Sequence, residues 1–263
     1  MKYSIVIPVS GGIERLDMLL ASIERRCRRR HAEVIAVDDG CEEQDAGRLI
    51  SLRKDGRLDI LVEHGSRRGF AAAVNSGIRS STADLIVVMH ADVVAGPNTL
   101  GRLASRLEPS GPASVVSAVC CRAPSPAYVL APELQYRLIE SFSSPTTKVD
   151  ERLVGMYGDF DAFCRTARIT RPDLVYTQEG YIFAAMFTRE TWAEVGEMEE
   201  SFSGRGMADR LWVDRLYAIG GRMYVDRSTY CHHWGGDERP SCGEGLHYED
   251  FKRDMLRETG RLP

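Results

Sequence analysis

Short apolar runs alternate with helical patterns through the first 107 residues, and this alternation restricts the fold more than any other feature. The apolar runs predict buried strands at 3–9, 33–40, 57–65 and 84–93. Apolar residues at helical spacing predict helices at 16–23, 69–81 and 96–107. Because strand–helix–strand units build a mostly parallel sheet flanked by helices, we predict a single α/β domain.

The second half of the sequence is less regular. It predicts a strand at 114–121 and then a proline-containing stretch, 122–175, which we interpret as an insertion over one edge of the sheet. A strand, two helices and a final extended segment complete the predicted core, at 181–187, near 191–195, near 208–219 and at 222–236. We expect the domain to span 1–236, with halves 1–110 and 111–236, and a peripheral tail at 237–263.

The composition is that of an ordinary globular protein, with 43% hydrophobic and 27% charged residues. A net charge of −4 gives no general attraction to nucleic acid or to an anionic membrane. The seven cysteines show neither a CxxC pair nor a regular spacing, so we expect reduced thiols and a cytoplasmic location. No apolar run approaches the eighteen residues of a membrane-spanning helix.

Polar motifs follow three of the predicted strands. They are PVSGG from Pro8, DDG from Asp38 and HAD from His90. The carboxyl ends of parallel strands share one edge of a sheet, where ligands bind in such folds. In a strand that continued to residue 93, His90 and Asp92 would point to the same side. The sequence therefore predicts a site that contains an imidazole and a carboxylate at this edge.

Six stretches in this order resemble the family 2 glycosyltransferases, which are nucleotide-sugar-dependent enzymes of the GT-A fold. Between residues 4 and 236 these stretches are SIVIPVSGG, EVIAVDDG, RRGFAAAVNSGI, LIVVMHADVV, GRGMADRLWVDRLYAIGG and CHHWGG. The resemblance implies an enzyme that moves a sugar from a nucleoside diphosphate sugar to an acceptor hydroxyl. UDP is the default nucleotide by analogy.

The resemblance also implies a set of nucleotide-binding residues along the predicted edge. They are Pro8, Val9, Asp38, Asp39, Arg68, Gly69, Asn75, His90 and Ala91. The acceptor is expected to contact Glu179 and Gly180, and its class stays open among saccharide, lipid carrier, protein and modified base.

A metal site and a catalytic base follow from the same resemblance. Asp92 takes the place of the last acid of the DXD-like motif, and His232 that of a later histidine, so together they would hold Mn²⁺ or Mg²⁺. His232 and His233 are adjacent in an extended segment and face opposite sides, so at most one of them should reach the metal. Asp209 would take the acceptor proton as a general base in a single, inverting displacement.

Two positions depart from the family pattern, because His90 replaces the first acid of the DXD-like motif and Ala208 replaces a glutamate beside Asp209. Because of these departures, a second function stays open, in which the protein binds a nucleotide or a glycan without catalysing a reaction. A sugar nucleotidyltransferase is a weaker alternative, because PVSGGIERL lacks the dense basic loop that a triphosphate requires. The same residues could instead have structural roles, because Asp209 could cap a helix and the two acids of DDG could form a turn.

Overall fold

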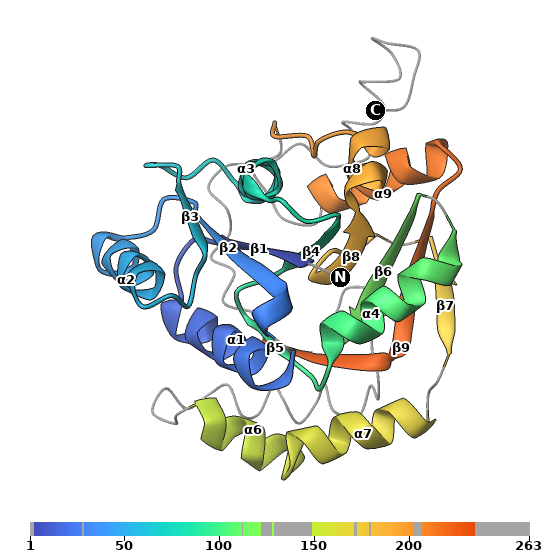
Figure 1. Ribbon diagram of the computed structural model, residues 1–263, viewed down its shortest axis with the longest axis horizontal. Helices are drawn as coiled ribbons and strands as arrows, with labels where there is room; N and C mark the ends of the chain where they lie inside the picture. The colour runs from blue at the N-terminus through green and yellow to red at the C-terminus, as the bar shows by residue number, and fades with distance from the viewer. Residues whose placement is uncertain are drawn as a thin grey trace.

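The computed structural model describes residues 3–27, 29–111, 113–121, 128, 149–170, 173–178, 180–201 and 207–234. Its strands form one sheet with helices on both faces (Figure 1). In order across the sheet the strands are β3 (Ile60–Glu63), β2 (Ala32–Asp38), β1 (Tyr3–Val9), β4 (Leu85–Met89), β8 (Ala184–Thr188), β6 (Ser114–Val119), β9 (Arg222–His233) and β5 (Val93–Ala95), while β7 (Leu174–Thr177) pairs with β9.

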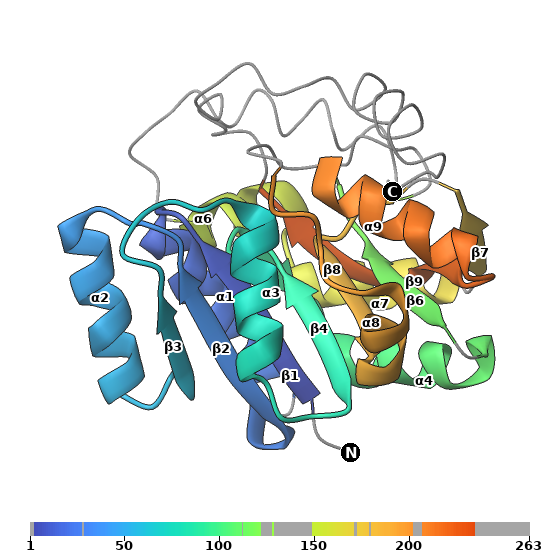
Figure 2. The same ribbon diagram turned by 90° about the horizontal axis from the view of Figure 1, so that it is seen from above.

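The N-terminal half has the predicted parallel arrangement of β3, β2, β1 and β4. Helices α1 (Ile13–Arg26) and α3 (Phe70–Ser80) lie on opposite faces of these strands (Figure 1), and α3 lies over β1 and β2 (Figure 2). A Cβ atom on Gly77 would lie 2.4 Å from Cγ1 of Val6, so the glycine lets α3 approach the sheet closely. Helix α2 (Glu43–Lys54), which the sequence analysis did not predict, follows β2.

The second half adds antiparallel pairs to the sheet. Strand β8 lies antiparallel between β4 and β6, whereas β6 and β9 are parallel. Helices α4 (Thr99–Leu107), α8 (Arg189–Val195) and α9 (Met207–Ala218) occupy the predicted helical segments. The α/β prediction is therefore confirmed, with β8 as the antiparallel strand that joins its two parallel parts.

Two helices, α6 (Val149–Tyr157) and α7 (Phe160–Thr170), lie within the segment that we predicted to be an irregular insertion. They lie on the same side of the sheet as α1 (Figure 1), and α7 packs against β9. Phe160, Cys164 and Ala167 are buried at helical spacing, which explains why this segment forms a helix.

The strand predicted at 84–93 is divided in two. Strand β4 ends at Met89, and the amide of Val93 donates to the carbonyl of His90 at 3.2 Å, which closes a turn. After this turn, β5 pairs with the end of β9, so that Val93 lies opposite His233. His90 and Asp92 therefore belong to a turn rather than to one strand face.

Several further expectations concern the whole chain. Among the described residues, none of the helices combines the length and the apolar character needed to cross a bilayer. The six cysteines in the described ranges form no disulfide. The predicted tail at 237–263 lies outside the described residues, and the domain limits stay predictions.

Candidate functional site

Three side chains able to bind a metal converge where β4 and β9 end. His90, Asp92 and His233 each offer one ligand atom, and these atoms lie within 4.8 Å of one another. Nε2 of His233 lies 3.3 Å from Nδ1 of His90 and 3.3 Å from Oδ1 of Asp92. Both histidines are buried, and the Asp92 side chain is only 13% exposed. We call these three residues the His–Asp–His cluster.

The His–Asp–His cluster fits a divalent cation by its spacing and its chemistry. In an octahedral site with bonds of about 2.1 Å, neighbouring ligand atoms lie about 3 Å apart. The two separations of 3.3 Å around Nε2 of His233 are close to that value. Imidazole nitrogen favours transition metals and carboxylate oxygen suits Mg²⁺ and Mn²⁺, so the mixed donor set suits Mn²⁺ better than Mg²⁺.

The structure places His233, rather than the predicted His232, beside Asp92. The two imidazoles lie on opposite sides of β9, as expected for adjacent residues in a strand. Nδ1 of His232 lies 2.8 Å from the hydroxyl oxygen of Tyr157 in α6 and 3.4 Å from Sγ of Cys121. Burial lowers the pKa of His232 to about 3, which keeps this imidazole neutral.

The segment 181–183 holds the His–Asp–His cluster from one side. The hydroxyl oxygen of Tyr181 lies 3.3 Å from Nδ1 of His233, and the carbonyl of Phe183 accepts a hydrogen bond of 2.8 Å from the amide of His90. The ring of Phe183 also packs against the ring of His233, with centroids 5.3 Å apart. Nothing in the local sequence around Tyr181 connects this residue with the CHHWGG motif, so the contact could not be predicted from the sequence.

The same segment holds Asp209. This residue is the third of α9 and is 1% exposed, and its Oδ2 accepts a hydrogen bond of 3.2 Å from the amide of Ile182. A Cβ atom on Gly180 would lie 2.8 Å from Cβ of Val213, so the glycine allows the segment to contact α9 directly. Glu179, the other residue predicted to bind the acceptor, lies outside the described residues.

The two acids of the DDG motif are engaged by the protein itself. Oδ1 of Asp38 accepts a hydrogen bond of 2.8 Å from the amide of Cys41, which is the turn-forming role considered above. The carboxylate of Asp39 accepts hydrogen bonds from the amides of Arg68, at 2.7 Å, and Gly69, at 2.9 Å. Contact of either acid with a nucleoside stays a prediction.

Asn75 connects α3 to the segment before α9, and Arg68 connects the loop before α3 to the same segment. Nδ2 of Asn75 donates to the carbonyl of Met198 and its Oδ1 accepts from the amide of the same residue, both at 2.9 Å. The side chain of Arg68 is 46% exposed, and its guanidinium pairs with Glu200 at 2.9 Å. The amide of Asn75 is thus engaged within the protein, while Arg68 presents a cation at the edge of the sheet, and contact of either residue with a nucleotide stays a prediction.

The edge occupied by Asp39 is continuous with the His–Asp–His cluster. Gly69 donates to Asp39, and the next residue, Phe70, packs its ring edge-on against the ring of His90, with centroids 5.3 Å apart. The strand ends that form this edge also carry the remaining predicted residues, Pro8, Val9 and Ala91.

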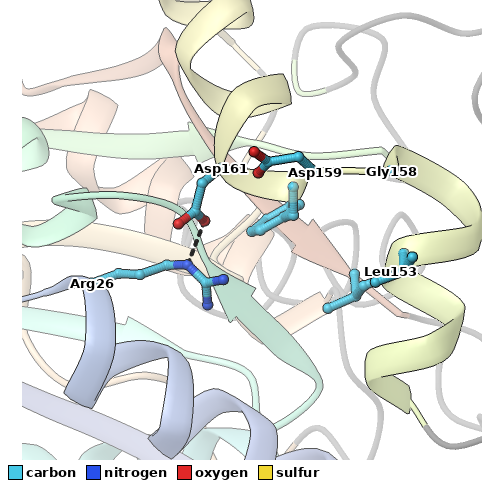
Figure 3. Close-up of a pocket in the computed structure, with 7 residues that line it drawn as sticks. Arg26, Leu153, Gly158, Asp159 and Asp161 are labelled. Atoms are coloured by element: carbon cyan, nitrogen blue, oxygen red, sulfur yellow. Dashed lines mark hydrogen bonds and ion pairs between the residues drawn. The ribbon is translucent and has the colours of Figure 1, made fainter.

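A separate pocket of about 350 Å³ lies between the end of α1 and the helices α6 and α7 (Figure 3). Leu153 and Phe160 form part of its wall, and Nε of Arg26 donates to Oδ1 of Asp161 at 2.6 Å beside it. This pocket shares no residue with the His–Asp–His cluster or with the predicted nucleotide-binding residues.

Residues 4–165 match the family model for glycosyl transferase family 2. The chain is 33% identical over 106 residues to an undecaprenyl-phosphate 4-deoxy-4-formamido-L-arabinose transferase of Pseudomonas paraeruginosa. The matched region is 39% of this chain and 31% of the relative. It is 27% identical over 241 residues to the validoxylamine A glucosyltransferase of Streptomyces hygroscopicus subsp. jinggangensis. This matched region is 86% of the chain and 54% of the relative. The chain thus spans about a third to a half of the length of these relatives.

The fold resembles the solved structure of GalNAc-T7 with UDP, GalNAc and Mn²⁺. The TM-score is 0.64 and the sequence identity 12%, over 89% of this chain and 44% of that chain, so the likeness concerns the fold alone. It confirms the GT-A fold expected from the sequence. Since the family model matches more than half of the residues, the chain belongs to glycosyl transferase family 2.

Proposed function

We propose that this protein transfers a sugar from a nucleoside diphosphate sugar to an acceptor, with a divalent cation held by His90, Asp92 and His233. The convergence of these three side chains at the edge of the sheet is the observation that carries the proposal. The GalNAc-T7 structure with UDP and Mn²⁺ supports the same type of donor complex. The Pseudomonas and Streptomyces relatives are both named as transferases of sugars.

A bound Mn²⁺ or Mg²⁺ would neutralise the charge that develops on the diphosphate as the bond to the sugar breaks. His90 takes the place of an acid, so the protein contributes one carboxylate and two imidazoles to this site. The His–Asp–His cluster therefore carries less negative charge than a site with two acids, and its nitrogen atoms favour Mn²⁺ over Mg²⁺.

We assign Asp209 the role of the base that takes the acceptor proton. Its carboxylate is buried, and the amide of Ile182 fixes the position of Oδ2. General base assistance is worth about a hundredfold to ten-thousandfold in rate. Because one displacement on the sugar carbon inverts its configuration, the product should have the opposite anomeric form to the donor, which NMR of the product can verify.

The donor would lie along the edge that leads from β1 and β2 to the His–Asp–His cluster. We propose that Pro8, Val9, Asp38 and Asp39 surround the nucleoside. The side chain of Arg68 is half-exposed, and its guanidinium is a suitable partner for phosphate oxygens because it presents several N–H donors in a fixed plane. For the acceptor, the name of the Pseudomonas relative supports a polyprenyl phosphate as the first candidate to test.

The test is the release of UDP or GDP from a panel of nucleotide sugars, with Mn²⁺ or with EDTA and with polyprenyl phosphate or saccharide acceptors. We expect release that depends on Mn²⁺ and is abolished by His233→Ala. The matched control, His31→Ala, removes an exposed histidine and should leave release unchanged. Tight nucleotide binding without release under every acceptor would contradict the proposal and favour a binding module.

A further inference from the structure

A histidine that the family resemblance does not involve lies between two of the elements that form the donor edge. Nδ1 of His64 lies 3.0 Å from Oδ1 of Asp39, and its Nε2 lies 2.9 Å from Oγ of Ser76 in α3. The side chains of His64 and Asp39 are 3% and 5% exposed, and Ser76 is 9% exposed. The imidazole thus connects the end of β2 with α3 inside the protein.

The partners of His64 determine where its proton lies. A carboxylate only accepts hydrogen bonds, so Nδ1 carries the proton and donates to Asp39. In the neutral ring, Nε2 is then the acceptor for the hydroxyl of Ser76.

Asp39 in turn fixes the loop that follows β3. Its Oδ1 also accepts from the amide of Arg68 and its Oδ2 from the amide of Gly69, so His64 shares Oδ1 with Arg68. The loop is tightly packed here, because a Cβ atom on Gly40 would lie 2.4 Å from the backbone nitrogen of Arg67. A rotated Asp39 carboxylate would therefore release the backbone that presents Arg68.

We propose that His64 is a positioning residue of the donor site, which orients the Asp39 carboxylate and through it the Arg68–Gly69 backbone that meets the nucleotide. This inference rests on the proposed function for its effect on nucleotide binding. Its effect on the loop does not depend on that function. Hydrogen bonds to a charged group are stronger than neutral ones, so the contact from Nδ1 is the one that matters most.

Two substitutions of similar polarity separate the contacts of His64. His64→Asn keeps an N–H donor near the place of Nδ1 and loses the contact with Ser76. His64→Gln reaches toward Ser76 and lacks a donor at the place of Nδ1. The first measurement is the amide hydrogen exchange of Arg68 and Gly69 by NMR without nucleotide, and the second is the Kd of UDP and GDP with Mn²⁺ by calorimetry.

We expect His64→Gln to accelerate the exchange of both amides by roughly tenfold and to weaken nucleotide binding by roughly tenfold, as for one lost hydrogen bond to a charged group. His64→Asn should stay close to the wild type in both measurements. Equal effects of the two substitutions, or unchanged amide exchange in His64→Gln, would overturn the inference. If the amides respond as expected but the wild type binds neither nucleotide, the positioning role stands and the proposed function fails.

Discussion

The hydroxyl oxygen of Tyr181 lies 3.3 Å from Nδ1 of His233, while Nε2 of the same ring lies 3.3 Å from Oδ1 of Asp92. A hydrogen bond at one ring nitrogen fixes the tautomer and leaves the other nitrogen available to a metal. Tyr181 therefore selects Nε2 of His233 as the atom that faces the proposed cation. The contact links a residue before β8 with the end of β9.

Tyr181→Phe should weaken Mn²⁺ binding by about tenfold, because outer contacts to metal-binding histidines typically contribute tenfold to a hundredfold in affinity. The Phe ring can keep the stacking on Phe183, whose centroid lies 5.3 Å away, so the substitution removes mainly the hydroxyl. Calorimetric titration with Mn²⁺ in the presence of UDP measures the effect. Tyr176→Phe, at a tyrosine that is 48% exposed, is the control, and equal Mn²⁺ affinity in both variants would refute the role of Tyr181.

Asp209→Asn should lower kcat by at least about a hundredfold and leave the Kd of the nucleotide sugar unchanged. The amide oxygen of Asn can still accept from the backbone of Ile182, so α9 stays in place, but it cannot take a proton. Steady-state kinetics and calorimetry separate the two effects. Asp214→Asn removes a partly exposed acid from the same helix and should change neither value, and a fall in kcat below fivefold in Asp209→Asn would rule out its role as base.

The thiol of Cys41 should resist alkylation near neutral pH. Burial, together with the neighbouring Asp38 carboxylate, raises the pKa of Cys41 to about 12. At pH 8 only about one molecule in ten thousand then carries the reactive thiolate, and this fraction grows as the pH rises toward 12. Asp38→Asn removes the negative charge, lowers the thiol pKa and should accelerate modification.

Mass spectrometry after reaction with iodoacetamide at pH 8 and pH 10 measures this rate for Cys41. Rapid modification of the wild type at pH 8, at the rate of a thiol in a free peptide, would show that Asp38 and burial do not suppress the reactivity of Cys41.

The parallel half of the sheet could be predicted because its strands, and most of the helices that flank them, each show a characteristic pattern within a short segment of sequence. The run from Tyr3 to Val9 is apolar apart from Ser4, and α1 shows its buried residues at helical spacing. The helices α6 and α7 were missed because prolines before and after them suggested irregular structure, although Phe160, Cys164 and Ala167 carry a helical pattern.

Two members of the His–Asp–His cluster were predicted to lie together, but the contacts that bring them together were not. The sequence indicated that His90 and Asp92 act together, although a turn and not a strand face brings them close. Which of the two adjacent histidines faces Asp92 depends on the register of β9 against β5, and local sequence does not encode that register. The contacts of Tyr181 and His64 join residues far apart in the chain, so their positions could come only from the structure.

In the proposed metal site, His233, and not its neighbour His232, holds the cation together with His90 and Asp92. Electron paramagnetic resonance of Mn²⁺ tests it directly, because the signal of free Mn²⁺ falls as the ion binds. We predict that wild type and His232→Asn bind one Mn²⁺ per chain with similar affinity in the presence of UDP, and that His233→Ala loses this binding. Equal Mn²⁺ binding by His233→Ala and the wild type, or loss of binding in His232→Asn alone with the fold intact, would show that His233 does not hold the cation.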